Sequence, residues 1–236
     1  MALQEAEDAA GDIPVMLVHG FAGSFERTWR EPGWTDLLGN ERGSVIGVDL
    51  LGHGKAAKPA DPAAYVSLEQ SIVTAMPASG LIDAVGFSLG AELVLCVAAA
   101  MPGRFRRIVL AGVGDGVFAA APDPEPIARA IETGQAGEAA GPFAAALVHF
   151  AVSGGNDPAA LAACLRRPRS PLTEAEVAAI RARVLVVLGE RDFARPADRL
   201  VAALAGSTLV TLSGTDHYGT MRDFRFAAAA LDFLRS

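Results

Sequence analysis

The stretch Gly86-Phe87-Ser88-Leu89-Gly90 decides the fold. It has the pattern Gly-x-Ser-x-Gly; the apolar run Leu81–Val85 leads into it, and the helix-like run Ala91–Met101 leads out. A strand, a sharp turn and a helix form the context of a nucleophile elbow, in which a strained turn lifts a serine hydroxyl above the edge of a sheet. Glycine suits both ends of the pattern because a Cβ there would crowd the neighbouring backbone. The context predicts that Ser88 is a nucleophile. The alternative is an ordinary turn whose hydroxyl caps the following helix.

The composition is that of one globular domain, with 236 residues of which 51% are hydrophobic and 20% charged. The net charge of -7 argues against non-specific binding to nucleic acid, which requires a basic face. Cys96 and Cys164 are the only cysteines, and two thiols without a Cys-x-x-Cys pattern do not make a zinc site. We therefore expect neither a nucleic-acid partner nor a bound metal.

The N-terminal segment, residues 1–12, is acidic and rich in alanine. It lacks the basic and then apolar pattern of a signal peptide, and no apolar run in the chain reaches the length of a membrane span. We therefore expect residues 1–12 to be a disordered tail and residues 13–236 to form a single domain. The same observations predict a cytoplasmic protein without a membrane partner.

Short apolar runs alternate with helix-like segments along the chain. The runs, typical of strands buried on both faces of a parallel sheet, are Pro14–Val18, Ser44–Val48, Leu81–Val85, Arg107–Ala111, Val184–Leu188 and Ser207–Leu212. Helices are expected at Tyr65–Met76, Ala91–Met101 and Met221–Leu234, and helix or turn at Thr28–Leu38. The alternation predicts a three-layer α/β fold with about six parallel strands, whose carboxyl-end loops build the site.

The alternation stops between about residues 114 and 180. Glycine and proline punctuate three short helix-like segments there, Ile127–Thr133, Phe143–Val152 and Pro158–Leu165. We interpret this segment as an insertion over the sheet edge, a small helical lid. Near its end, Thr173 and Glu176 have the spacing of a capping box, which predicts a helix that starts at Glu174.

Five motifs at predicted strand ends resemble those of the α/β-hydrolase family and follow the order that the family uses. They are His19-Gly20-Phe21, Asp49–Gly54, the elbow, Gly189-Glu190-Arg191-Asp192 and Asp216-His217. Within the family, the chain is most similar to small carboxylesterases and to lyases of the menaquinone pathway, the SHCHC synthase group. Family members usually carry a β-hairpin before the first of these motifs. Here too few residues precede the first strand, so we expect the hairpin to be missing.

The resemblance points to His217 as the catalytic base among four histidines. A serine hydroxyl is a poor nucleophile at neutral pH, so it needs a base within hydrogen-bond reach. His217 follows the last predicted strand, where the family places its base. His19 lies in the oxyanion loop, where the family uses it structurally. His53 lies in a glycine-rich loop at the rim of the site, and His149 lies in the apolar run of the lid.

Asp192 is the candidate for the acid that orients the histidine, because it follows the penultimate strand as the family's acid does. A loop salt bridge with a neighbouring arginine is the other interpretation of Asp192. Asp115 is the alternative acid, at a position that some family members use. Asp216 is adjacent to His217 in sequence, and adjacent side chains usually diverge. We therefore expect Asp216 to cap the last helix.

The resemblance also implies an oxyanion hole made of the backbone N–H groups of Leu89 and Phe21. Together these residues predict a serine hydrolase that cleaves carboxylic esters of small molecules, without a metal or an organic cofactor. One alternative is a lyase or a carbon–carbon bond hydrolase of the same fold. A lyase for a carboxylate-rich substrate would have basic pocket residues, and the lid offers Arg129, Arg166, Arg167 and Arg169. The other alternative is a non-catalytic receptor for a small molecule.

Overall fold

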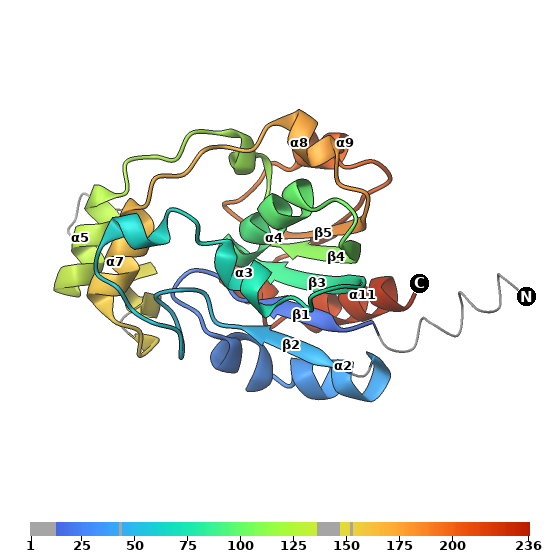
Figure 1. Cartoon of the computed structure of the whole chain (residues 1–236), viewed down its shortest axis with the longest axis horizontal. Coiled ribbons are helices and arrows are strands. Elements are labelled where there is room, and N and C mark those ends of the chain that lie inside the picture. The colour runs from blue at the N-terminus through green and yellow to red at the C-terminus, as the bar shows by residue number, and fades with distance from the viewer. Residues whose placement is uncertain (1–12, 43, 136–146, 152) are drawn as a thin grey trace, which may run out of the picture.

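The computed structural model describes residues 13–42, 44–135, 147–151 and 153–236. They form one parallel sheet of six strands in the order β2-β1-β3-β4-β5-β6, with helices on both faces (Figure 1). The strands are β1 (Val15–Val18), β2 (Val45–Val48), β3 (Ile82–Phe87), β4 (Phe105–Ala111), β5 (Arg183–Gly189) and β6 (Thr208–Leu212). The predicted α/β fold and its parallel sheet are confirmed. The predicted tail, residues 1–12, lies outside the described residues.

The helices fall into two layers and a separate group above the sheet edge. The short helices and turns are η2 (Glu26–Arg30), η3 (Pro62–Tyr65), η4 (Asp115–Phe118), α8 (Glu174–Ala178), α9 (Asp198–Ala203) and α10 (His217–Thr220). The longer ones are α2 (Trp34–Arg42), α3 (Gln70–Ala75), α4 (Leu89–Ala100), α5 (Glu125–Thr133), α7 (Pro158–Arg166) and α11 (Phe224–Arg235). Thr173 and Glu176 make the predicted capping box at the start of α8.

The residues of β1 show how the sheet is buried on both faces. Met16 and Val18 pack in one apolar cluster, which includes residues of α3, α4, α8 and α9. Val15 and Leu17 pack in the opposite cluster, which includes residues of η2, α2 and α11. All four side chains are fully buried. Because successive side chains of a strand point to opposite faces, an unbroken apolar run is what a strand between two helical layers requires.

The chain reverses its direction across the sheet next to β1. It runs outward from β1 to β2, crosses back past β1 to β3, and then continues through β4 and β5 to β6. The loops that follow β1 and β3 therefore leave the same edge as neighbours. A reversal of this kind opens a crevice at the carboxyl ends of the strands, which is where an α/β protein builds its site.

Two predicted helices are shorter than expected. Of the segment predicted as Tyr65–Met76, only α3 is α-helical; Tyr65 ends η3, and residues 66–69 form a turn. Tyr65 is fully buried, and its hydroxyl donates to the Pro59 carbonyl at 2.7 Å. The segment predicted as Met221–Leu234 begins as a helix only at α11. There the Asp223 side chain accepts the Arg225 N–H at 2.9 Å and caps the first turn.

The lid helices α5 and α7 lie side by side at the end of the sheet away from the C-terminus (Figure 1). They share an apolar cluster with Ala22, which belongs to the loop after β1. Residues 147–151 are helical, and the rest of the predicted Phe143–Val152 helix lies partly outside the described residues. Within the described ranges, no helix has the length and apolar character needed to cross a lipid bilayer.

Candidate active site

Ser88 stands at a strained turn between β3 and α4. Its backbone has φ 53° and ψ −118°, a left-handed conformation that a residue with a Cβ rarely adopts. A Cβ built on Gly90 would lie 2.5 Å from the Val18 carbonyl oxygen, and one on Gly86 would lie 2.7 Å from Ala91 Cα. The two glycines of the motif therefore let β3 and α4 pack directly on the neighbouring backbone, as the sequence predicts.

The Ser88 hydroxyl does not cap α4. No side-chain capping bond is present at this helix start, and Ser88 Oγ lies 3.0 Å from His217 Nε2 instead. The interpretation of Ser88 as an ordinary capping residue is therefore not the one that the structure favours. His217 comes from the first turn of α10, 129 positions further along the chain.

Asp192 holds the other side of the His217 ring. Its Oδ1 lies 2.8 Å from His217 Nδ1 and also accepts the Ala194 N–H at 2.8 Å. Both side chains are buried, with His217 and Asp192 each 4% exposed. A carboxylate accepts a hydrogen bond, so Nδ1 carries the proton and Nε2 presents its lone pair to the Ser88 hydroxyl.

Aromatic rings and a glycine fix the plane of the His217 ring. The Phe87 ring lies 4.9 Å and the Phe193 ring 4.1 Å from it, centroid to centroid. A Cβ built on Gly112, which has φ 68°, would lie 2.9 Å from His217 Cε1. The imidazole therefore has little freedom to turn away from Ser88.

The other two aspartates proposed from the sequence have structural contacts. Asp115 Oδ1 accepts the Leu200 N–H at 2.9 Å and thereby supports the first turn of α9. Asp216 caps α10, with Oδ1 accepting the Gly219 N–H at 2.7 Å. Asp216 is thus a helix cap as predicted, but of the short helix α10; the last helix, α11, is capped by Asp223 instead. Asp192 is the acid that the structure brings to His217.

Phe21 and Leu89 lie where two backbone N–H groups can converge beside Ser88. Leu89 is the first residue of α4, so its N–H has no partner within the helix. The loop of Phe21 passes close to the elbow, since a Cβ on Gly20 would lie 3.2 Å from Ser88 Cβ. Among the described residues, neither N–H group has a hydrogen-bond acceptor. These contacts are compatible with the predicted oxyanion hole.

His19 and His53 are buried beneath the site. His19 Nε2 accepts the Leu50 N–H at 3.1 Å and Nδ1 lies 2.8 Å from the Gly20 carbonyl, so the ring joins the loops after β1 and β2. Burial lowers the pKa of His19, and burial followed by repulsion from His19 lowers the pKa of His53 to about 3. Both rings are therefore neutral at physiological pH. The predicted rim position of His53 is wrong, because its side chain is fully buried.

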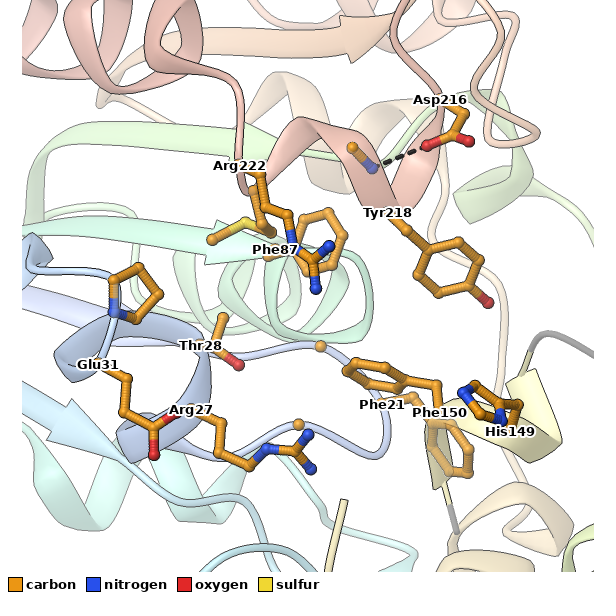
Figure 2. Close-up of a pocket in the computed structure, with 15 residues that line it drawn as sticks. Phe21, Arg27, Thr28, Glu31, Phe87, His149, Phe150, Asp216, Tyr218 and Arg222 are labelled. Atoms are coloured by element: carbon orange, nitrogen blue, oxygen red, sulfur yellow. Dashed lines mark hydrogen bonds between the residues drawn. The ribbon is translucent and has the colours of Figure 1, made fainter. Parts of the chain in front are cut away.

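A cavity of about 800 Å³ lies between the loop after β1 and the segment that follows His217 (Figure 2). Chain neighbours of the triad, Phe87, Asp216 and Tyr218, line it, whereas Ser88, Asp192 and His217 do not. The aromatic side chains in its wall are Phe21, Phe87, Phe150 and Tyr218. Its other named side chains are Arg27, Thr28, Glu31, Pro32, His149, Asp216, Met221 and Arg222. His149 is thus an exposed residue at this cavity rather than a member of the triad. Within the described ranges, no cluster of three or more His, Cys, Asp or Glu side chains is placed to hold a metal ion.

The four lid arginines do not line this cavity. Arg166 pairs with Glu125 and Glu132, Arg129 pairs with Glu125, and Arg169 pairs with Glu92. Arg167 donates to the Cys164 carbonyl at 2.8 Å. The basic residues that do line the cavity are Arg27 and Arg222, which the sequence did not single out because neither belongs to a motif.

Asn156 is a second residue that the sequence did not indicate. Its Nδ2 donates to the Ala22 carbonyl at 2.8 Å and to the Gly23 carbonyl at 3.3 Å, and its Oδ1 accepts the Gly54 N–H at 2.9 Å. One lid side chain therefore ties the loops after β1 and β2 together. Its position directly before the Asp157 cap of α7 carried no signal of this contact.

Residues 15–229 match the sequence profile described as "Alpha/beta hydrolase family". A stretch of 104 residues is 35% identical to "Pyrrolizixenacetamide deacetylase" of Xenorhabdus hominickii. That stretch covers 42% of this chain and 36% of the relative, so the match spans about a third of the relative's length.

Solved structures share the fold over nearly the whole chain. The enol-lactonase from Burkholderia xenovorans LB400 superposes with a TM-score of 0.76 and 20% identity, covering 95% of this chain and 92% of its own. The esterase RhEst1 from Rhodococcus sp. ECU1013 gives a TM-score of 0.65 and 23% identity, covering 96% and 92%. At these identities the likeness concerns the fold.

Proposed function

The chain belongs to the α/β-hydrolase family, and we propose that it is a serine hydrolase that cleaves carboxylic esters of small molecules. One observation carries the proposal. Ser88, His217 and Asp192 form a continuous chain of hydrogen bonds, 3.0 Å and 2.8 Å long, from the nucleophilic oxygen to a buried carboxylate. This arrangement is the one that activates a serine for acyl transfer.

In the proposed acylation step, Ser88 Oγ attacks the ester carbonyl carbon while His217 Nε2 accepts the hydroxyl proton. Asp192 stabilises the imidazolium that forms and keeps the ring in place, without taking the proton itself. Negative charge develops on the carbonyl oxygen, and the N–H groups of Phe21 and Leu89 donate to it. The positive end of the α4 dipole adds to this stabilisation. Collapse of the intermediate breaks the ester bond, and His217 protonates the leaving alcohol.

In the proposed deacylation step, His217 takes a proton from water, which attacks the acyl group on Ser88. The same two N–H groups stabilise the second oxyanion, and the proton returns from His217 to Ser88 Oγ as the acid leaves. His217 accepts and returns every proton that moves in the two steps. The cavity of about 800 Å³, lined by the chain neighbours of Ser88 and His217, is large enough for a small-molecule ester.

The lid arginines that the sequence offered for a lyase site do not serve the cavity; the basic residues that line it are Arg27 and Arg222, and they suit an ester or a lyase substrate that bears a carboxylate equally well. Arg129, Arg166 and Arg169 are held by protein carboxylates and lie outside the cavity wall. If the protein were a non-catalytic receptor, the strained turn at Ser88 and the buried carboxylate of Asp192 would have no chemical role. Strain of this kind is characteristic of active sites.

Turnover of p-nitrophenyl acetate and p-nitrophenyl butyrate tests the proposal. We expect saturable release of p-nitrophenol by the wild type and a fall of at least about 10³-fold in kcat for Ser88→Ala. The variant should keep its thermal unfolding temperature, because the hydroxyl contributes no capping bond to α4. Turnover that is absent, or that persists unchanged in Ser88→Ala, would reject ester hydrolysis through this residue.

An N-acyl amide is the second candidate substrate, because the local sequence match to a deacetylase favours it. The same triad would attack an amide carbonyl, with His217 protonating the leaving amine. Acetyl-p-nitroanilide, measured beside p-nitrophenyl acetate, compares the two leaving groups on one acyl chain. A larger kcat/KM for the anilide would make deacylation of amides the principal activity.

A further inference from the structure

We propose that the cavity lined by the chain neighbours of the triad binds the negatively charged end of an acid-bearing ester, and that Arg222 is the side chain that recognises it. The inference rests on the proposed ester hydrolysis and adds the chemical class of the substrate. It assigns a specificity role to Arg222, which lies outside the triad and outside the predicted oxyanion hole.

Arg222 lies in the short connection between α10 and α11, five positions after His217. Its backbone N–H donates to the Gly219 carbonyl at 3.0 Å, and the next residue, Asp223, caps α11. The backbone that carries Arg222 is therefore fixed on both sides. Figure 2 shows its side chain reaching toward the cavity, which is also lined by Phe87, the residue that precedes Ser88.

The guanidinium of Arg222 has no ion-pair partner among the described residues. The neighbouring Arg225 differs, because it is paired with Asp223 and donates to the Ser213 carbonyl at 2.9 Å. Arginine presents several donors in a planar fork that matches a carboxylate. An unpaired guanidinium that points into a cavity is therefore available to an anionic ligand.

Arg27 adds a second positive charge on another side of the cavity. Its Nη1 donates to the Ser153 carbonyl at 3.1 Å, and its guanidinium lies 6.0 Å from the centre of the Phe150 ring. The lid therefore holds Arg27 against the cavity. This contact leaves other N–H groups of the guanidinium for a ligand.

Two carboxylates also belong to the cavity wall, and neither forms an ion pair with Arg222. Asp216 Oδ1 accepts the Gly219 N–H at 2.7 Å in its role as a helix cap. Glu31 follows η2 and lies on the Arg27 side of the cavity in Figure 2, away from Arg222. The region around Arg222 and Phe87 is thus the part of the cavity best suited to an anion.

The rest of the wall suits the body of such a substrate. Phe21, Phe87 and Met221 offer apolar surface in the wall of the cavity. The ring of Tyr218 also belongs to the wall, and its hydroxyl is buried away from the cavity. The overall charge of -7 repels anions at long range, so attraction must come from local contacts such as Arg222.

A matched pair of esters tests the inference. The mono-p-nitrophenyl ester of glutaric acid carries a carboxylate at the end of its acyl chain, and p-nitrophenyl hexanoate is an uncharged ester of similar length. For Arg222→Gln we expect kcat/KM to fall about 10-fold or more for the glutarate ester, because a charge-assisted hydrogen bond is lost. For the hexanoate ester we expect a change below about twofold.

Arg181→Gln is the matched control, because it removes the same charge from an exposed position. Arg181 precedes β5 and lies at the amino ends of the strands, whereas the cavity lies at their carboxyl ends. It should leave both esters unaffected. Added salt should lower kcat/KM for the glutarate ester in the wild type more than in Arg222→Gln. Equal losses for both esters in Arg222→Gln, or equal losses in Arg181→Gln, would overturn the inference while the proposed esterase activity stands.

A binding measurement separates the inference from the esterase proposal. Calorimetric titration of glutarate into Ser88→Ala and into Ser88→Ala/Arg222→Gln needs no turnover. We expect binding to the first and a loss of affinity of about 10-fold or more in the second. Absence of Ser88-dependent turnover for both esters would reject the proposed function. Absence of glutarate binding, or equal binding to both variants, would reject the role of Arg222.

Discussion

At the residue scale, Asp192 acts through one buried oxygen. Oδ1 receives both the His217 ring proton and the Ala194 N–H, so the carboxylate is oriented before any substrate arrives. The sequence left Asp115 as an alternative because both aspartates follow a strand in a glycine-rich turn. The decision between them depends on contacts across the sheet edge, which no local pattern records.

Replacement of Asp192 by Asn should lower kcat by roughly 10³–10⁴-fold, as the loss of the orienting carboxylate does in the serine-protease triad from which this magnitude is taken. An amide in place of the carboxylate favours the wrong tautomer of His217. Asp115→Asn is the matched control and should retain kcat within a factor of about two, since its carboxylate supports α9. Steady-state kinetics of both variants on p-nitrophenyl butyrate shows which aspartate orients His217. A larger loss in Asp115→Asn than in Asp192→Asn would make Asp115 the acid.

At the scale of elements, the elbow and the lid show what sequence patterns can and cannot predict. The motif Gly-x-Ser-x-Gly indicated a strand–turn–helix because the steric demand on its two glycines is local. The late start of α3 within the predicted Tyr65–Met76 helix was not predictable, since no local pattern records that Tyr65 packs in the core and bonds to Pro59. The contacts of Asn156 are likewise made with loops far away in sequence.

Gly90→Ala tests the packing of the elbow. Its Cβ would lie 2.5 Å from the carbonyl oxygens of Val18 and His19, so β1 and α4 must separate. We expect a loss of about 1–3 kcal/mol in the free energy of unfolding, measured by urea denaturation. Gly103→Ala is the control, because nothing lies within 4 Å of its added methyl group. Equal stability of the two variants would contradict the tight approach of α4 to β1.

Asn156→Ala tests whether the lid positions the loop of Phe21. The substitution removes the two hydrogen bonds to the Ala22 and Gly23 carbonyls and the one from Gly54 N–H. We expect kcat to fall roughly 10-fold while KM changes less, because a loosened oxyanion hole affects the transition state. Asn156→Asp keeps the acceptor for Gly54 and loses both donors, so it should show the same loss. Wild-type kcat in both variants would leave Asn156 with a structural role only.

At the scale of the whole molecule, the order of the motifs along the chain predicted the fold, whereas their arrangement in space could not be predicted from the sequence. Alternating apolar runs predicted the parallel sheet, because strands between two helical layers must be apolar on both faces. The cavity is assembled from segments far apart in sequence, among them η2 and the connection after α10. Its arginines carry no periodicity or motif, so only the folded chain brings them together.

Acid stability is a property of the whole molecule that the buried histidines determine. Burial lowers the pKa of His19, and the pKa of His53 falls from 6.5 to about 3. Below pH 6.5 the unfolded chain binds protons that the native state does not, so stability falls as pH falls. Between pH 7 and pH 5 we expect His53 to contribute a loss of about 2 kcal/mol in the free energy of unfolding, measured by urea denaturation, and His19 a further loss of the same sign.

His53→Asn supplies the comparison for this pH dependence. The difference in stability between pH 7 and pH 5 should be about 2 kcal/mol smaller in this variant than in the wild type, whatever the stability of the variant at pH 7. The carboxylate of Asp223, whose pKa is lowered chiefly by Arg225, affects stability only at more acidic pH and does not interfere in this window. A slope that is the same in His53→Asn and the wild type would show that His53 does not stay neutral in the fold.

The central claim is that Ser88 is an activated nucleophile, and covalent labelling tests it most directly. The protein is incubated with a fluorophosphonate, digested and examined by mass spectrometry, with Ser88→Ala treated in parallel. We expect one adduct per chain on the peptide that contains Ser88, and none in Ser88→Ala, because His217 and Asp192 activate that hydroxyl alone. An unlabelled wild type, or equal labelling of Ser88→Ala, would contradict the account.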